Sequence, residues 1–426
     1  MYKLLSVHKK KVVFLSIIIL LVLTIKFELF GFKDFLYKNY PNLSLHKEFR
    51  GEKSLREHID NDFNTVFLPD TQYEKLNIIK NKINFKPEYY KKYRSTKSGI
   101  ATARYGSFFI EIFDENIWIV DYLGTIYKID KDKINHKNYT NITPKIINSN
   151  FTSNKVLDIF INDKKIYLSS ANEINNCKKL EIFVAEINSE KLSFEKFYSP
   201  KECGDLILGG RMQFYKHKNS DGIIFTTHGH NYNKPDNTPQ DDTSIYGKIL
   251  FVGFNDKNQI MFSKGHRVSQ GLFVEDNLIL QTEHGPKGGD EINKITFQKN
   301  YGWPVASYGE NYNSGYTIKP YYKKNHQKNY FEEPVYSFVK SIGISEIIKL
   351  PNTFSKHFQD NFILSSLYGR HLYRIKFNSL FNRIIYIENI YIGERIRDLK
   401  FHNKLNLIIL AFEENGEIGI LSNNSH

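Results

Sequence analysis

The chain has 426 residues, including 33 Phe and 28 Tyr, and a formal net charge of +13. This length allows two average domains or one large repeat domain with a sizeable core. The lysines are scattered among Asn, Ile and Tyr, without a basic stripe or a nucleic-acid motif. This scattered distribution of charge argues against a nucleic-acid partner. The positive charge leaves attraction to an anionic membrane surface open.

The first 32 residues have the pattern of a membrane anchor. Lys9, Lys10 and Lys11 precede a mostly apolar run over Val12–Ile25, and a shorter apolar run follows over Leu29–Phe32. The longer run is short for a spanning helix, which usually needs about 20 residues, but lysine snorkelling and the later Phe residues can extend it. No Ala-x-Ala cleavage site follows, so an uncleaved signal anchor is favoured over a removed signal peptide. We expect a single-pass protein with a cytoplasmic N-terminus and its remainder on the periplasmic or extracellular side.

Residues 33–104 are charged and rich in Lys and Asn, without clear strand alternation. This composition predicts a stalk or spacer with some helix, such as Tyr73–Asn81.

From residue 105 to residue 426 the texture changes to short apolar runs separated by turn residues. Examples are Phe108–Phe113, Ile117–Val120, Val156–Ile161, Leu180–Ile187, Ile384–Ile392 and Asn406–Phe412. So many short strands exceed what an immunoglobulin-like sandwich holds and favour a β-propeller. About 320 residues at roughly 50 per blade predict six blades. The expected fold is all-β, a six-bladed β-propeller preceded by an N-terminal transmembrane anchor helix.

The chain has two cysteines, Cys177 and Cys203. In an exported domain a single pair is a candidate disulfide, and the alternative is two unrelated buried thiols.

A series of short motifs rich in Gly, Arg and acidic residues follows in chain order. They are Gly209-Gly210-Arg211, Gln240-Asp241 with Gly247-Lys248-Ile249-Leu250, Gly265-His266-Arg267 with Gln270-Gly271-Leu272, Glu283-His284-Gly285-Pro286 with Gly288-Gly289-Asp290-Glu291-Ile292-Asn293, Asn300-Tyr301-Gly302-Trp303-Pro304 with Ser307-Tyr308-Gly309, Ser365-Ser366-Leu367 with Arg370, and Arg395-Ile396-Arg397-Asp398. In this order the segment from about residue 105 to 421 resembles the soluble glucose/sorbosone dehydrogenase family, the PQQ-dependent aldose sugar dehydrogenases. The resemblance implies a six-bladed propeller that uses PQQ and Ca²⁺.

By position, the resemblance implies that Arg267, Arg395 and Arg397 contact the cofactor and that Gln240 supplies a further polar contact. Guanidinium groups suit the carboxylates of PQQ because they can bind them through two parallel hydrogen bonds. The alternative for each arginine is a surface ion pair. Arg395 and Arg397 lie two residues apart, so both can face the same way from one strand and share an anionic ligand.

The resemblance also implies metal ligands. Gly285 and Pro286 match the positions whose backbone carbonyls hold the cofactor's calcium, and hard oxygen donors suit that ion. Glu291 and the backbone at Tyr301 resemble a second, structural calcium site. The alternative for Asp290-Glu291 is an ordinary solvated acidic turn.

The catalytic position departs from the family pattern. The resemblance implies a histidine general base four residues before Arg211, and this chain has Ile207 there. Val268 replaces a usual Asn, and Tyr368 replaces a usual Lys, in the same expected pocket. His228 and His230 are candidate substitutes for the base; as a pair they could instead ligate a metal or be ordinary loop residues.

Two functions follow from this pattern. The first is a membrane-anchored PQQ-dependent sugar dehydrogenase that oxidises aldoses by hydride transfer to PQQ. The alternative is a catalytically impaired propeller, with Ile207 in place of the base, that binds a ligand or an envelope protein. The expected partners are a small-molecule sugar or a glycan, and the membrane through the N-terminal segment.

Overall fold

In the computed structural model, the described residues are 65–68, 70–87, 91–94, 101–104, 106–135, 138–187, 191–204, 206–229, 237–310 and 322–423. The anchor predicted over residues 1–32 lies outside these ranges. Among the residues inside them, no helix is both long and apolar enough to cross a membrane.

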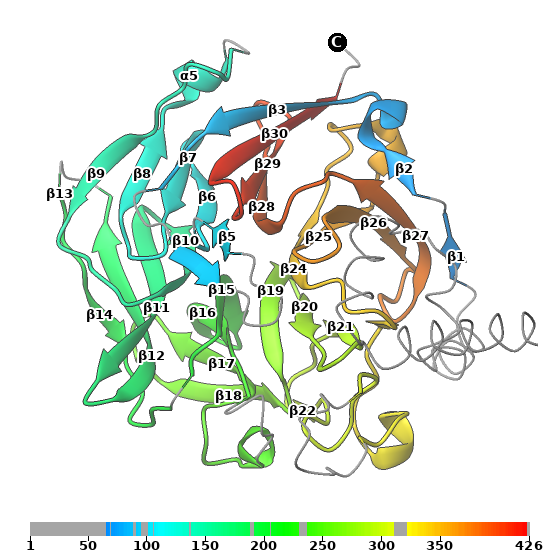
Figure 1. Cartoon of the computed structure of the whole chain (residues 1–426). Helices are drawn as coiled ribbons and strands as arrows, with labels where there is room; N and C mark the ends of the chain where they lie inside the picture. The colour runs from blue at the N-terminus through cyan, green and yellow to red at the C-terminus, as the bar shows by residue number, and fades with distance from the viewer. Residues whose placement is uncertain are drawn as a thin grey trace, which may run out of the picture. The chain divides into compact units, whose positions relative to one another are not determined.

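Six β-sheets form the six blades of a β-propeller (Figure 1), which confirms the predicted architecture. From centre to edge, the first three blades are β6 (Phe109–Phe113), β7 (Asn116–Val120), β8 (Ile126–Ile129), β9 (Lys145–Ser149) and β13 (Lys191–Leu192); β10 (Val156–Asn162), β11 (Lys165–Ile174), β12 (Cys177–Glu186) and β14 (Glu195–Tyr198); and β15 (Gly209–His217), β16 (Ser220–Thr227), β17 (Lys248–Gly253), β18 (Gln259–Lys264) and β22 (Lys299–Asn300).

The other three blades follow the same order. They are β19 (Val268–Glu275), β20 (Leu278–His284), β21 (Asp290–Lys294) and β23 (Tyr336–Phe338); β24 (Ile344–Lys349), β25 (Phe362–Ser366), β26 (His371–Phe377) and β27 (Ile384–Tyr391), with β1 (Val66–Phe67) and β2 (Thr71–Gln72) on β27; and β28 (Ile396–His402), β29 (Leu407–Phe412), β30 (Glu417–Asn423) and β3 (Ile78–Asn84). Short helices are η2 (Tyr73–Leu76), α5 (Lys131–Asn135), η3 (Thr238–Gln240), η4 (Gln327–Asn329) and η5 (Lys356–Phe358), and β4 (Lys91–Arg94) pairs with β5 (Ala101–Arg104).

Tight polar turns explain why the chain folds into consecutive antiparallel strands. Strands β11 and β12 are joined through Asn175 and Asn176, which both have positive φ, and Ile174 pairs with Cys177 across the turn. Two-residue turns with positive φ match the twist of the strands that they join, and Asn tolerates that conformation.

Strand β3 closes the propeller, although it lies before the boundary at residue 105 that the sequence suggested. It pairs antiparallel with the last strand, from Ile78 opposite Asn423 to Asn84 opposite Glu417. The helix expected over Tyr73–Asn81 is wrong beyond Leu76, because Asn77 adopts a left-handed conformation and ends the short η2. Ile78 is buried against the last two blades, and Ile83 is buried between the first and the last blade. Part of the expected spacer is therefore a blade strand.

The innermost strands meet at a buried polar hub. We define the hub by its charged side chains, which are Glu111, Asp158, Arg211, Glu346, Asp398 and Lys400. Arg211 Nη1 lies 3.0 Å from carboxylate oxygens of both Asp158 and Asp398, and 3.2 Å from Glu346 Oε2. Its Nε donates to the carbonyl of Gln270 at 2.6 Å. One guanidinium thus connects its own blade to four others at the axis.

Burial raises the pKa of two hub carboxyls, even though Arg211 and Lys400 act in the opposite direction. The pKa of Asp158 rises to about 6 and that of Glu346 to about 7. In the unfolded chain such carboxyls titrate near pH 4. The contribution of these two carboxyls to the free energy of unfolding is therefore fully present below about pH 4 and is lost as the pH rises through 6 and 7.

Between pH 5 and pH 8 the wild type should lose about 2 kcal/mol of unfolding free energy that Glu346→Gln keeps, because one pKa unit corresponds to about 1.4 kcal/mol. The difference between the two proteins should therefore shift by this amount in favour of Glu346→Gln. Urea unfolding of both proteins at each pH measures this difference and cancels the opposing titration of buried histidines such as His326. Glu275→Gln, at a surface ion pair with Lys349, is the control. Parallel pH curves for wild type and Glu346→Gln would contradict the prediction.

Candidate functional site

The turn after β20 is built rigidly by its own polar contacts. Asp290 accepts hydrogen bonds from the backbone amide of Gly285 at 3.1 Å, and from those of Ile342 and Gly343 at 2.9 and 2.8 Å. Gly289 has a φ of +71°, and a Cβ there would lie 2.2 Å from the backbone nitrogen of Gly309. The turn therefore requires glycine and holds the carbonyl of Gly285 in one direction.

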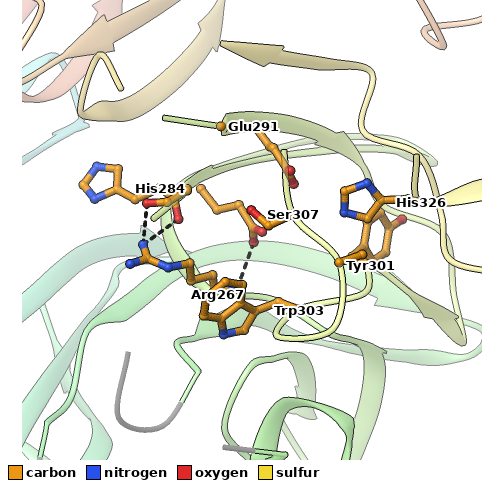
Figure 2. A pocket seen from close by; sticks show the side chains of 11 residues that line it. Arg267, His284, Glu291, Tyr301, Trp303, Ser307 and His326 are labelled. Carbon is orange, nitrogen blue, oxygen red and sulfur yellow. Dashed lines mark hydrogen bonds between the residues drawn. The ribbon is translucent and has the colours of Figure 1, made fainter. Parts of the chain in front are cut away.

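Arg267 points into this turn (Figure 2). Its Nη1 donates to the carbonyl oxygens of His284 at 2.9 Å and Gly285 at 2.6 Å. The guanidinium carbon lies 5.1 Å from the centre of the Trp303 ring, and the residue is only 3% exposed. A buried cation thus lies on one of the two carbonyls that the resemblance assigns to calcium.

A small pocket lies beside this turn, with several buried ionisable groups in its wall. It is lined by Arg267, Glu283, His284, Gly285, Gly289, Glu291, Tyr301, Trp303, Ala306, Ser307 and His326. Burial, together with the charge of Glu283, raises the pKa of Glu291 well above its usual value. Burial also lowers the pKa of His326 to about 4, and its Nδ1 has no hydrogen-bond partner among the described residues. The pocket wall therefore contains buried carboxyl groups, and a bound cation would offset the cost of ionising them.

The predicted metal ligands are only partly gathered there. Glu291 and Tyr301 both line the pocket, but the Tyr301 ring stacks on His266 with centroids 4.7 Å apart. Within the described ranges, no group of three or more His, Cys, Asp or Glu side chains is arranged to hold a metal ion. Calcium binding at Gly285, Pro286, Glu291 and Tyr301 stays a prediction.

Arg395 and Arg397 do face the same way, as their spacing predicted, but they face a carboxylate of the protein. Arg395 donates through Nε and Nη2 to Oε1 of Glu413 at 3.0 and 2.9 Å, and Arg397 donates through Nε to Oε2 at 2.8 Å. Arg397 Nη1 also donates to Gln270 Oε1 at 2.7 Å. Burial alone would raise the pKa of Glu413, but the two arginines lower it to about 2.

Gln240 serves the scaffold of the site. Its side-chain amide donates to Asn300 Oδ1 at 3.1 Å and to the carbonyl of Trp303 at 2.6 Å, and it accepts from Asn300 Nδ2 at 2.7 Å. These contacts position the segment that places Trp303 over Arg267.

The position of the missing base lies in the core. Ile207 is 1% exposed and packs in an apolar cluster with Tyr246 and Met212. His228 is 0% exposed, and its Nδ1 accepts a hydrogen bond from the amide of Leu208 at 3.1 Å. His230 lies outside the described residues. Neither Ile207 nor His228 presents a proton acceptor to solvent.

The structure brings several predicted residues together through His284. Burial lowers the pKa of His284, and the charges of Arg397 and Arg267 act in the same direction. Its Nε2 lies 2.7 Å from the carbonyl of Ile344. We call Arg267, Arg395 and Arg397 the arginine cluster. Glu413, which pairs with two of its members, belongs to none of the sequence motifs.

The residue types of the cluster suit PQQ and calcium, but their contacts do not fit them as they stand. Carboxylates of a quinone need guanidinium donors that face outward, whereas Arg395 and Arg397 are bonded to Glu413. Calcium needs the carbonyl of Gly285, which accepts from Arg267.

Solved structures of sugar dehydrogenases have the same propeller fold as this chain. A crystal structure of a glucose dehydrogenase superposes with a TM-score of 0.64 at 20% identity, covering 81% of this chain and 99% of that one. The PQQ-bound form of aldose sugar dehydrogenase from Streptomyces coelicolor gives a TM-score of 0.55 at 18% identity, covering 78% of this chain and 97% of that one. The fold is thus that of sugar dehydrogenase propellers.

The sequence matches the model of the Glucose / Sorbosone dehydrogenase family over residues 112–420. The chain belongs to this family, as a divergent member with Ile207 at the usual histidine position. It is 29% identical over 228 residues to aldose sugar dehydrogenase YliI of Escherichia coli K12, which is 50% of this chain and 58% of that protein. The match therefore spans little more than half of that relative.

Proposed function

We propose that this chain is a sugar dehydrogenase-like propeller that binds a small sugar or glycan and does not oxidise it by the base-assisted route of its family. The observation that carries this proposal is the burial of Ile207 at the position of the base. A general base must come within hydrogen-bonding reach of the proton that it removes. His228 is fully buried and accepts a backbone hydrogen bond, so it does not supply that reach.

A sugar-binding role is supported by family membership and by one exposed aromatic side chain. Tyr368, at a position where the resemblance implies a cation, is 68% exposed. Aromatic side chains with a few polar groups are usual in small-molecule sites.

The second candidate is PQQ-dependent oxidation of an aldose, with the quinone as the hydride acceptor. The retained arginine cluster and the Gly285-Pro286 turn support it, as does the PQQ-bound relative. Glu413 and Arg267 would then have to exchange their present partners for the cofactor and the metal.

Membrane anchoring and an outward-facing propeller are also part of this proposal. The lysines and apolar run before residue 33 support them. The disulfide between Cys177 and Cys203 independently supports the outward-facing propeller, because disulfides persist in oxidising compartments.

The test is dye reduction by the purified full-length protein with PQQ, CaCl₂ and a panel of aldoses. We expect no rate above that of the protein-free mixture for either the wild type or His228→Ala. Turnover by the wild type would contradict the proposal, and its loss in His228→Ala would assign the base to His228. A glycan array tests the binding role, for which at least one bound sugar is expected; an array without binding would contradict it.

A further inference from the structure

Glu413 occupies the position of a ligand for the arginine cluster. The residue directly follows the last residue of β29 and is 5% exposed. Its two carboxylate oxygens are divided between the two arginines, with Arg395 on Oε1 and Arg397 on Oε2. Ser107 Oγ adds a weaker contact to Oε2 at 3.4 Å. The carboxylate is therefore satisfied by the protein alone.

Glu413 is ionised at physiological pH, so its ion pairs with the two arginines are present there. Its pKa is about 2, because the attraction of Arg397 and Arg395 exceeds the effect of burial. Charge-assisted hydrogen bonds of this kind are roughly twice as strong as neutral ones. An incoming carboxylate must therefore displace Glu413 or lie beside it as a like charge, and both are unfavourable.

A parallel substitution occurs at Arg267. Its guanidinium donates to the carbonyls of His284 and Gly285, so a side-chain cation fills a contact that a metal ion would otherwise make.

We infer that Glu413 determines the ligand specificity of the arginine cluster, by acting as a built-in carboxylate that excludes ligands with several carboxylates, such as PQQ. The inference rests on the proposed function, in which the face keeps its arginines without the chemistry of the family. It assigns to this chain a preference for neutral ligands, in agreement with a sugar. Replacement of Glu413 by a neutral side chain returns both guanidinium groups to an external anion.

The chain offers a matched control one residue further on. Glu414 accepts a hydrogen bond from Arg370 Nη2 at 2.6 Å. The side chain of Arg370 is 40% exposed and that of Glu414 is 22% exposed. Glu414→Gln removes the same charge as Glu413→Gln from a neighbouring position but leaves Arg395 and Arg397 paired. A general effect of net charge would appear equally in both variants.

The experiment is equilibrium binding of PQQ, measured by isothermal titration calorimetry on the full-length protein without sugar. We expect Glu413→Gln and Glu413→Thr to bind PQQ at least about tenfold more tightly than the wild type, as expected for regained charge-assisted contacts. Glu414→Gln should change the affinity less than about threefold, as expected for an exposed pair. Equal affinities for wild type and both Glu413 variants would overturn the inference.

A second arm covers the case in which the Glu413 variants do not fold, which circular dichroism will show. In the wild-type background, Arg395→Gln should leave PQQ affinity unchanged, because Glu413 already occupies that arginine. A loss of about tenfold or more, the size of one charge-assisted contact, would place Arg395 on the ligand and overturn the inference. Binding is measured here without turnover, so this result is separate from the dye assay that tests the proposed function.

Discussion

Replacement of Arg211 by Met is expected to lower the free energy of unfolding by about 3–5 kcal/mol, the cost of removing one partner from a buried ion pair. The guanidinium is 3% exposed and lies within 3.2 Å of three carboxylates from three different blades. Without it, Asp158, Glu346 and Asp398 lose the cation that offsets their burial at the axis. Urea unfolding followed by circular dichroism measures the loss.

Lys299→Met is the control for Arg211→Met. Lys299 pairs with Glu332 at 2.8 Å, but their side chains are 50% and 39% exposed. Exposed pairs contribute at most about 1 kcal/mol. If Arg211→Met lost no more stability than Lys299→Met, the hub would not be a main determinant of propeller stability.

Reduction of the disulfide is expected to lower the free energy of unfolding by about 3 kcal/mol, the usual contribution of a loop of this size. Cys177 and Cys203 are 26 residues apart and are bonded, as the sequence predicted. The bond ties the start of β12 to the segment that carries Glu202. Glu202 in turn accepts hydrogen bonds from the side chain of Ser244 and the amide of Ile245 at 2.8 Å.

The measurement is urea unfolding with and without dithiothreitol. The double variant Cys177→Ser/Cys203→Ser should be insensitive to the reductant and should unfold like the reduced wild type. A wild-type protein whose unfolding free energy did not change on reduction would refute this prediction.

Much of the fold was predictable because local patterns determine it. Short apolar runs with Asn, Asp and Gly turns identify blade strands, and the turn at Asn175-Asn176 behaves as such a pattern requires. Strand β3 was missed because Ile78–Asn84 has too few apolar residues to stand out. Its strand character comes from β30, at the opposite end of the chain.

The site was predictable in its positions and not in its contacts. The motifs led to Arg267, Arg395 and Arg397, and the structure places Arg395 and Arg397 on one carboxylate. That Glu413 pairs with two of these arginines depends on side chains that meet across adjacent strands. Spacing along one strand could not distinguish a bound ligand from a carboxylate of the same chain. Arg211 was noted only as part of a motif, because its carboxylate partners lie on three other blades.

The pairing of β3 with β30 also has a consequence for biosynthesis. Strand β3 leaves the ribosome among the first residues of the propeller, whereas its partner, Glu417–Asn423, is among the last. Contacts so distant in sequence form slowly because a long loop must close first. Throughout translation the nascent chain must therefore keep the free edge of β3 from pairing with other strands. The ring can be completed only after synthesis has reached residue 423.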